Sequence, residues 1–147
     1  MKKPSVNKVL STYIDINTRF SEVDSMGVVW HGNYVKYLED AREKMGAKFG
    51  MGYMDVYRNK FMIPIVKMNL DYKLPLYYEK KYRVHISVLD TIAAKIVCQY
   101  EIRNDQDQVC AKAETTQAFI NLDGELQLIT PQFFIDWKSQ QTWQEIK

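Results

Sequence analysis

The stretch "EVDSMGVVWHGNYVKYLEDAR", Glu22–Arg42, changes its pattern of apolar residues partway along. It begins as a loop whose flexible point is Gly27. Apolar residues then recur at steps of three and four, at Tyr34, Leu38, Ala41, Met45 and Phe49. This spacing predicts an amphipathic helix that begins near His31 and ends near Gly50 or Gly52, where glycine can terminate it. At 1.5 Å per residue the helix would be about 28 Å long.

Alternating apolar and polar residues predict strands on both sides of this helix. One strand precedes it, and four follow it, within residues 9–20, 61–75, 80–90, 94–104 and 108–124. The links between the later strands are short and polar, which suits antiparallel hairpins. Residues 130–146 predict a closing helix with Thr130 as its N-cap and Pro131 at its first position.

These elements predict an α+β fold, in which five antiparallel strands wrap around one long central helix and both bury their apolar faces. The chain has 147 residues, so residues 1–147 are expected to form a single domain. Apolar residues make up 46% of it, which is enough for a substantial core.

Charge and cysteine usage narrow the class of protein. The net charge of +2 argues against a dedicated nucleic-acid binder, and no apolar run approaches the roughly 18 residues that span a bilayer. Cys98 and Cys110 lie in strand-like segments without a CxxC spacing, so we expect buried free thiols in a reducing, cytoplasmic compartment. Two distant histidines fall short of a zinc site, and we expect neither a metal nor another cofactor.

Asp24 and His31 are the residues most suited to chemistry. Backbone N–H groups of residues 31–34 would lie unpaired at the positive end of the helix dipole, where they can polarise a carbonyl group. Asp24, seven residues before His31, could attack that carbonyl or take a proton from water. Spacing alone leaves a commoner interpretation open, in which Asp24 caps a turn and His31 is a structural residue.

The segment "RFSEVDSMGVVWHGNYVKYLEDAR", residues 19–42, resembles the N-terminal signature of the 4-hydroxybenzoyl-CoA thioesterase family. The similarity is to the acyl-CoA thioesterase branch found with the Tol–Pal genes in bacteria. The matching positions are Arg19, Phe20, Glu22, Asp24, Gly27, Val29, His31, Tyr34, Tyr37, Glu39, Ala41 and Arg42. The resemblance implies the hotdog fold over nearly the whole chain, and hydrolysis of an acyl-CoA thioester to a free acid and CoA.

The resemblance also implies roles for particular residues. Asp24 corresponds to the catalytic carboxylate, either as nucleophile or as general base. The backbone N–H of His31 would polarise the thioester carbonyl, with its imidazole implicated too. Because sites of this family lie between subunits, the resemblance implies a homodimer or homotetramer. Many members carry tyrosine where Phe20 stands, so this chain lacks that hydroxyl, and Tyr78–Glu79 replaces a common Gly-Asp pair.

Substrate contacts are expected from aromatic, methionine and lysine side chains. An acyl pocket is predicted to be lined by Trp30, Tyr34, Met62 and Met68. Methionine adapts to varied shapes, which favours a permissive aliphatic pocket. Lys67 and Lys73 could bind the phosphates of CoA, although surface lysines commonly serve solubility. Acyl carrier protein is a further candidate as the carrier of the acyl group.

Two other functions fit a hotdog fold. A dehydratase or hydratase also uses an acid and a histidine near the central helix, but its two residues lie closer together within one motif. The seven-residue gap from Asp24 to His31 favours the thioesterase. The other function is a non-catalytic module that binds acyl-CoA or acyl carrier protein. Such a module would be expected to have lost the acid, whereas Asp24 is present.

Overall fold

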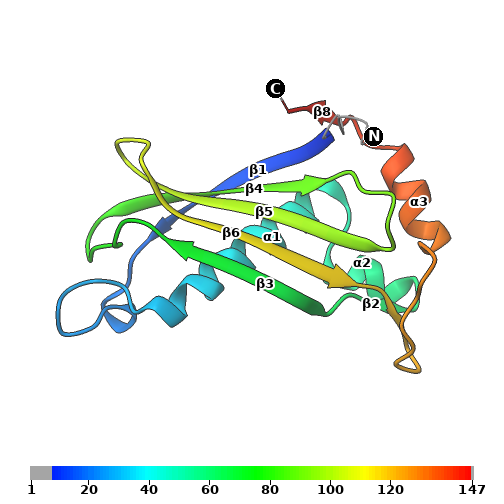
Figure 1. Cartoon of the computed structure of the whole chain (residues 1–147), viewed down its shortest axis with the longest axis horizontal. Helices are drawn as coiled ribbons and strands as arrows, with labels where there is room; N and C mark the ends of the chain where they lie inside the picture. The colour runs from blue at the N-terminus through cyan, green and yellow to red at the C-terminus, as the bar shows by residue number, and fades with distance from the viewer. Residues whose placement is uncertain (1–7, 147) are drawn as a thin grey trace, which may run out of the picture.

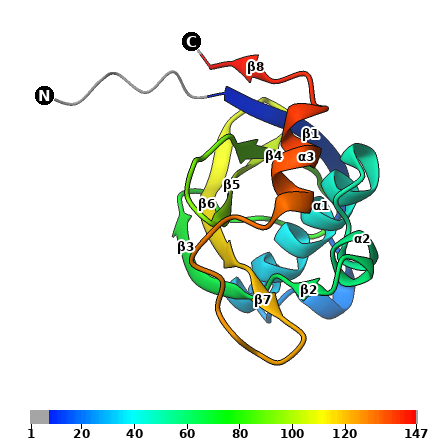
Figure 2. The ribbon, with the colours of Figure 1, turned by 90° about the vertical axis from the view of Figure 1, so that its right-hand side faces the viewer.

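The computed structural model describes residues 8–146, in which an antiparallel sheet curves around a long helix, α1 (Tyr34–Phe49) (Figures 1 and 2). The strand order within these residues is β3-β6-β5-β4-β1-β8. The strands are β1 (Lys8–Asn17), β3 (Ile65–Tyr72), β4 (Lys81–Leu89), β5 (Lys95–Asn104), β6 (Val109–Ala118) and β8 (Gln144–Glu145). The predicted hotdog-like architecture is confirmed, with one strand more than expected because the two-residue β8 pairs with the start of β1.

The inner face of the sheet is the apolar face that the alternation predicts. In β4, Tyr82, Val84, Ile86 and Val88 are buried, and each packs toward α1 with its neighbours from β5. Strict alternation in residues 61–75 would put Val66 on the same face as Met68 and Leu70. Val66 is instead 61% exposed, because a register shift between Ile65 and Lys67 turns it away from the core.

Helix α1 follows the predicted periodicity. Its buried residues are Tyr34, Tyr37, Leu38, Ala41, Met45 and Gly46. The helix ends at Phe49, and Gly50 follows in the left-handed conformation. Its beginning differs from the prediction, since His31–Asn33 form a single 3-10 turn, η2, before the α-helix starts.

The remaining elements close the ends of the fold. A second short helix, α2 (Tyr53–Arg58), leads to β2 (Phe61–Met62), which pairs with β7 (Ile120–Asn121). A 3-10 turn, η1 (Phe20–Glu22), follows β1. No helix within residues 8–146 is long and apolar enough to cross a membrane.

The last helix, α3 (Gln132–Ser139), packs against one end of α1 (Figure 1). The Trp137 indole N–H donates to the carbonyl of Phe49 at 2.6 Å, which ties α3 to the end of α1. The predicted N-cap is wrong by one residue. Pro131, not Thr130, occupies the N-cap, and its carbonyl accepts the N–H groups of Phe134 and Ile135.

Candidate active site

Asp24 lies in a small hairpin that joins β1 to the helix. Its backbone N–H donates to the carbonyl of Val28 at 2.8 Å, and an antiparallel bridge joins Val23 to Val29. Gly27 makes the tight turn possible, with a φ of +77° that side chains rarely adopt. The hairpin therefore holds the half-buried Asp24 close to the strand that leads into His31.

The Asp24 carboxylate uses one of its oxygens locally. Oδ1 accepts the backbone N–H of Met26 at 2.8 Å, so the side chain does stabilise its own turn. Oδ2 has no hydrogen-bond partner among residues 8–146. The capping role that spacing alone suggests is thus present, and it leaves an oxygen available for chemistry.

The start of the helix presents two unpaired donors rather than the predicted four. Asn33 N–H donates to the carbonyl of Trp30 at 2.9 Å, and Tyr34 N–H donates to the carbonyl of His31. The N–H groups of His31 and Gly32 have no acceptor among the residues that the structure describes. No side chain caps this end, so both donors lie at the positive end of the helix dipole.

Asn33 fixes the hairpin against the helix, a role that the sequence analysis missed. Its side-chain amide donates to the carbonyl of Glu22 at 2.9 Å, and the same carbonyl accepts the N–H of Trp30. Asn33 is 9% exposed. Asparagine at a helix start ordinarily indicates a cap, so the residue type alone does not reveal this bond.

Glu22 adds a second link one turn along α1. Its Oε1 accepts the Tyr37 hydroxyl and the Arg19 N–H, both at 2.8 Å. Burial, together with the bond to the Glu22 carboxylate, raises the pKa of Tyr37 above its ordinary value. Tyr37 therefore stays protonated and acts as a donor.

Tyr72, at the end of β3, holds the backbone of His31. Its hydroxyl donates to the His31 carbonyl at 2.9 Å, and its ring meets the imidazole edge-on with centroids 6.3 Å apart. The imidazole itself is exposed and lies 4.9 Å from the Trp30 ring. The edge strand of the sheet and the start of the helix are thus joined at the candidate site.

Trp30 and Tyr34 both lie beside the helix start, but in different environments. The Trp30 indole lies over Gly32, where an added Cβ would come within 2.1 Å of the ring, so only glycine permits this contact. Trp30 is 53% exposed and is free to contact a ligand. Tyr34 is buried, its ring lies 4.8 Å from that of Tyr72, and burial raises its pKa to about 12. Tyr34 therefore packs on the core side of the candidate site, against Tyr72.

The other predicted contacts are not all brought together. Met68 lies half-buried on the inner face of β3, while Lys67 and Lys73 are exposed on and just after the same strand. Strand β2, which contains Met62, lies toward the opposite end of α1 from η2 (Figure 1). Within residues 8–146, no group of three or more His, Cys, Asp or Glu side chains could hold a metal ion.

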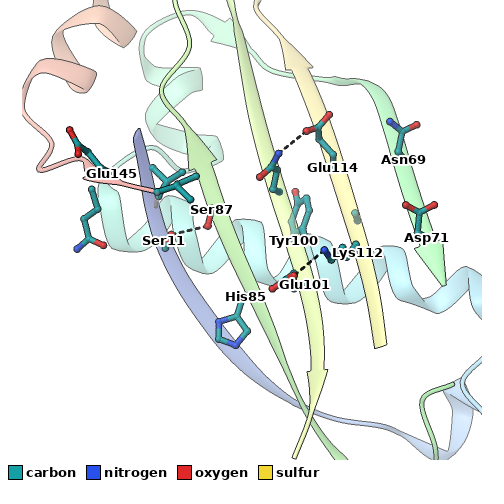
Figure 3. A pocket seen from close by; sticks show the side chains of 15 residues that line it. Ser11, Asn69, Asp71, His85, Ser87, Tyr100, Glu101, Lys112, Glu114 and Glu145 are labelled. Carbon is teal, nitrogen blue, oxygen red and sulfur yellow. Dashed lines mark hydrogen bonds and ion pairs between the residues drawn. The ribbon is translucent and has the colours of Figure 1, made fainter. Parts of the chain in front are cut away.

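A separate hollow lies on the outer face of the sheet, with α1 behind it (Figure 3). Its polar groups largely bond to one another, such as the Ser11 and Ser87 hydroxyls at 2.8 Å. His85 lines it, and burial followed by the charges of Arg103 and Arg83 lowers the pKa of this histidine. None of the predicted site residues lines this hollow, so Asp24 and His31 remain the candidate centre.

Comparisons with known proteins agree with this fold. Residues 18–137 match the model of the thioesterase-like superfamily. The chain is 29% identical to the putative acyl-CoA thioesterase YneP of Bacillus subtilis over 123 residues, which cover 84% of this chain and 89% of that protein.

Solved structures agree as well. A DHNA-CoA thioesterase from Staphylococcus aureus superposes with a TM-score of 0.78 at 28% identity, over 88% of this chain and 87% of that one. A variant of 4-hydroxybenzoyl-CoA thioesterase, in complex with 4-hydroxybenzoyl-CoA, shares the fold with a TM-score of 0.74 at 20% identity, over 86% and 97% of the two chains. Because the family model covers most of its length, this chain belongs to the thioesterase-like superfamily.

Proposed function

We propose that this protein is an acyl-CoA thioesterase, which hydrolyses an acyl-CoA thioester to a free acid and CoA. The observation that carries the proposal is the Asp24 carboxylate, with Oδ2 unbonded among residues 8–146, on a hairpin that leads into the unpaired N–H groups of His31 and Gly32. The names of the Bacillus subtilis and Staphylococcus aureus relatives support the same reaction.

In the proposed reaction, the N–H groups of His31 and Gly32 donate to the thioester carbonyl oxygen and stabilise the negative charge that develops there. Asp24 then acts in one of two ways. As a nucleophile it attacks the carbonyl carbon, expels the CoA thiolate and forms a mixed anhydride that water hydrolyses. As a general base it takes a proton from the water that attacks the carbonyl carbon, and the tetrahedral intermediate then breaks its C–S bond and expels CoA. Both routes consume one water molecule and give the same products.

The surroundings of Asp24 and His31 support a site for the rest of the substrate. We place the acyl chain against Trp30 and Met68, with Tyr34 beneath and Met62 farther along the pocket, and the CoA phosphates near Lys67 and Lys73. Met68 and Trp30 provide adaptable apolar surface, which favours aliphatic acyl groups. Acyl carrier protein is an alternative carrier of the same acyl groups.

The finer assignments follow from the signature in residues 19–42. It supports the acyl-CoA thioesterase branch found with the Tol–Pal genes in bacteria. The free, buried thiols of Cys98 and Cys110 suit a reducing compartment, so we propose a cytoplasmic enzyme. A homodimer or homotetramer would complete the site between subunits.

Incubation with a panel of acyl-CoAs and a thiol reagent tests the function. We expect release of free CoA, with aliphatic acyl-CoAs hydrolysed at least as fast as 4-hydroxybenzoyl-CoA. A change at the enoyl chromophore without CoA release would instead indicate a dehydratase or hydratase. Tight binding without turnover of any substrate, including acyl carrier protein thioesters, would indicate a binding module and overturn the proposal.

A further inference from the structure

A cavity of about 480 Å³ lies between α1, α2 and the residues that lead into β3. Its size is that of a small-molecule site. Six of its side chains form apolar walls: Met45, Met51, Ile63, Ile65, Ile96 and Phe134. Neither Asp24 nor His31 lines it, so the cavity is additional to the centre described above.

Arg42 gives this cavity one fixed polar group. Its Nη1 donates to the Tyr100 hydroxyl at 3.2 Å, and that hydroxyl is bonded to the Thr115 hydroxyl at 2.8 Å. Tyr100 is 2% exposed and Thr115 is fully buried, so the guanidinium is anchored from the core side. None of the carboxylates in residues 8–146 forms an ion pair with Arg42. Most of its five N–H donors are therefore available to a ligand.

The charges around the cavity indicate which acceptor Arg42 would bind. Glu39 and Glu43 line the same space. An anionic ligand group would meet two carboxylates for one guanidinium, which disfavours it. A neutral hydroxyl can accept a hydrogen bond from Arg42 and donate one to Glu39 or Glu43.

We propose that this cavity takes the far end of an aliphatic acyl chain, beyond the part that contacts Trp30 and Met68, and that Arg42 selects chains that carry a hydroxyl at the end far from the thioester. The inference rests on the proposed thioesterase function and goes beyond it, because it names a substrate class and a specificity-determining residue. A purely apolar pocket would disfavour such a hydroxyl, so the two cases give opposite preferences.

The free edge of the sheet connects the cavity to the reacting centre. Strand β3 ends the sheet, and a second copy can pair with it antiparallel about a two-fold axis. Full overlap of the two β3 strands sets Ile65 of one copy opposite Tyr72 of the other. Ile65 lines the cavity, and Tyr72 bonds His31. A thioester held at His31 of one copy would thus send its acyl group toward Arg42 of the other.

The test compares kcat/KM for octanoyl-CoA and 8-hydroxyoctanoyl-CoA. We expect the wild-type protein to prefer the hydroxylated substrate about 10-fold or more, the scale of one hydrogen bond to a charged group. Arg42→Met should abolish this preference, so that the ratio of the two kcat/KM values falls to about one or below. Arg58→Met is the matched control, since Arg58 is exposed and, within residues 8–146, pairs only with its helix neighbour Asp55; it should retain the preference.

Because Arg42 also bonds the buried Tyr100, the melting temperature of each variant is measured first. If Arg42→Met does not fold, Arg42→Lys serves instead and should show a smaller preference than the wild type. A wild-type ratio of one or less overturns the inference, whatever the variants do. A protein that hydrolyses no acyl-CoA at all would contradict the proposed function rather than this inference alone.

A mixed dimer tests the connection between the two copies. Asp24→Asn and Arg42→Met chains carrying different tags are co-expressed, and the hetero-dimer is purified through both tags. The hetero-dimer has one intact Asp24, on the Arg42→Met chain, and this Asp24 would face the intact Arg42 of the other chain. We expect the hydroxyl preference to return. Its absence in this hetero-dimer would overturn selection across the two-fold axis.

Discussion

At the scale of single residues, the carboxylate of Asp24 carries the proposed chemistry. Asp24→Asn keeps the size of the side chain and an oxygen that can accept the Met26 N–H, but it removes the negative charge. Either route needs that charge, so we expect kcat to fall by about 10²–10⁴-fold. Acyl-CoA binding and the melting temperature should change little. A variant with more than about a tenth of the wild-type rate would return Asp24 to a purely structural role.

His31 contributes through its backbone or through its imidazole. His31→Ala keeps the N–H that would polarise the carbonyl, and the Tyr72 hydroxyl can still bond the residue 31 carbonyl. We therefore expect a smaller loss of kcat than for Asp24→Asn, measured with the same acyl-CoA and thiol reagent. Equal losses in the two variants would show that the imidazole itself acts on the substrate or on water.

At the scale of elements, the link between β3 and η2 sets the position of the helix start. Tyr72→Phe removes the hydroxyl that bonds the His31 carbonyl and keeps the ring that packs on Tyr34. We expect the free energy of unfolding to fall by about 0.5–1.5 kcal/mol, as for one hydrogen bond. The kcat should fall as well, because the His31 and Gly32 donors are held less firmly.

Tyr13→Phe is the matched control for this change. Tyr13 lies on β1, is 47% exposed, and its hydroxyl bonds no residue among 8–146. Denaturant unfolding and steady-state kinetics of both variants check the prediction. Similar effects of the two substitutions on kcat would contradict a specific role for the Tyr72 hydroxyl.

Periodicity predicted the elements well because it reports directly which residues are buried. The stripe from Tyr34 to Met45 and the glycine after Phe49 placed the body and the end of α1 correctly, but not its start, which is a 3-10 turn. The alternation in β4 and β5 placed the inner face of the sheet. The predictions were wrong where pairing with a neighbouring strand decides whether a side chain is buried. The shift that exposes Val66 depends on the pairing of β3 with β6, which the local pattern of β3 does not contain.

The candidate site was predictable only in part, for a related reason. Asp24 and His31 lie within one short segment, so their spacing and the family signature were enough to name them as candidates. The contributions of Asn33 and Tyr72 are hydrogen bonds to backbone carbonyls of residues 11 and 41 positions away. No short sequence pattern encodes such bonds. The same holds for Arg42, whose anchor on Tyr100 requires the folded sheet.

At the scale of the whole molecule, the edge of β3, which no strand within residues 8–146 covers, predicts self-association. An edge strand with unpaired backbone groups is a ready template for a second chain. We therefore expect sedimentation at micromolar concentration to give at least a dimer. A stable monomer that is fully active would contradict both the proposed assembly and the site between subunits.

A designed charge tests which edge associates. With the β3 strands fully overlapped, Val66 of one copy lies near Asp71 of the other, and Val66 is already 61% exposed. Val66→Asp would place like charges opposite each other twice, once on each side of the two-fold axis, which destabilises a strand pair. We expect weaker dimerisation and a proportionate loss of activity at low protein concentration.

Ile92→Asp makes the same change at a fully exposed residue between β4 and β5, away from β3, and should leave the dimer intact. If both variants sediment as the wild type does, the copies meet through another surface, and the route from His31 to the Arg42 of a second copy fails with it.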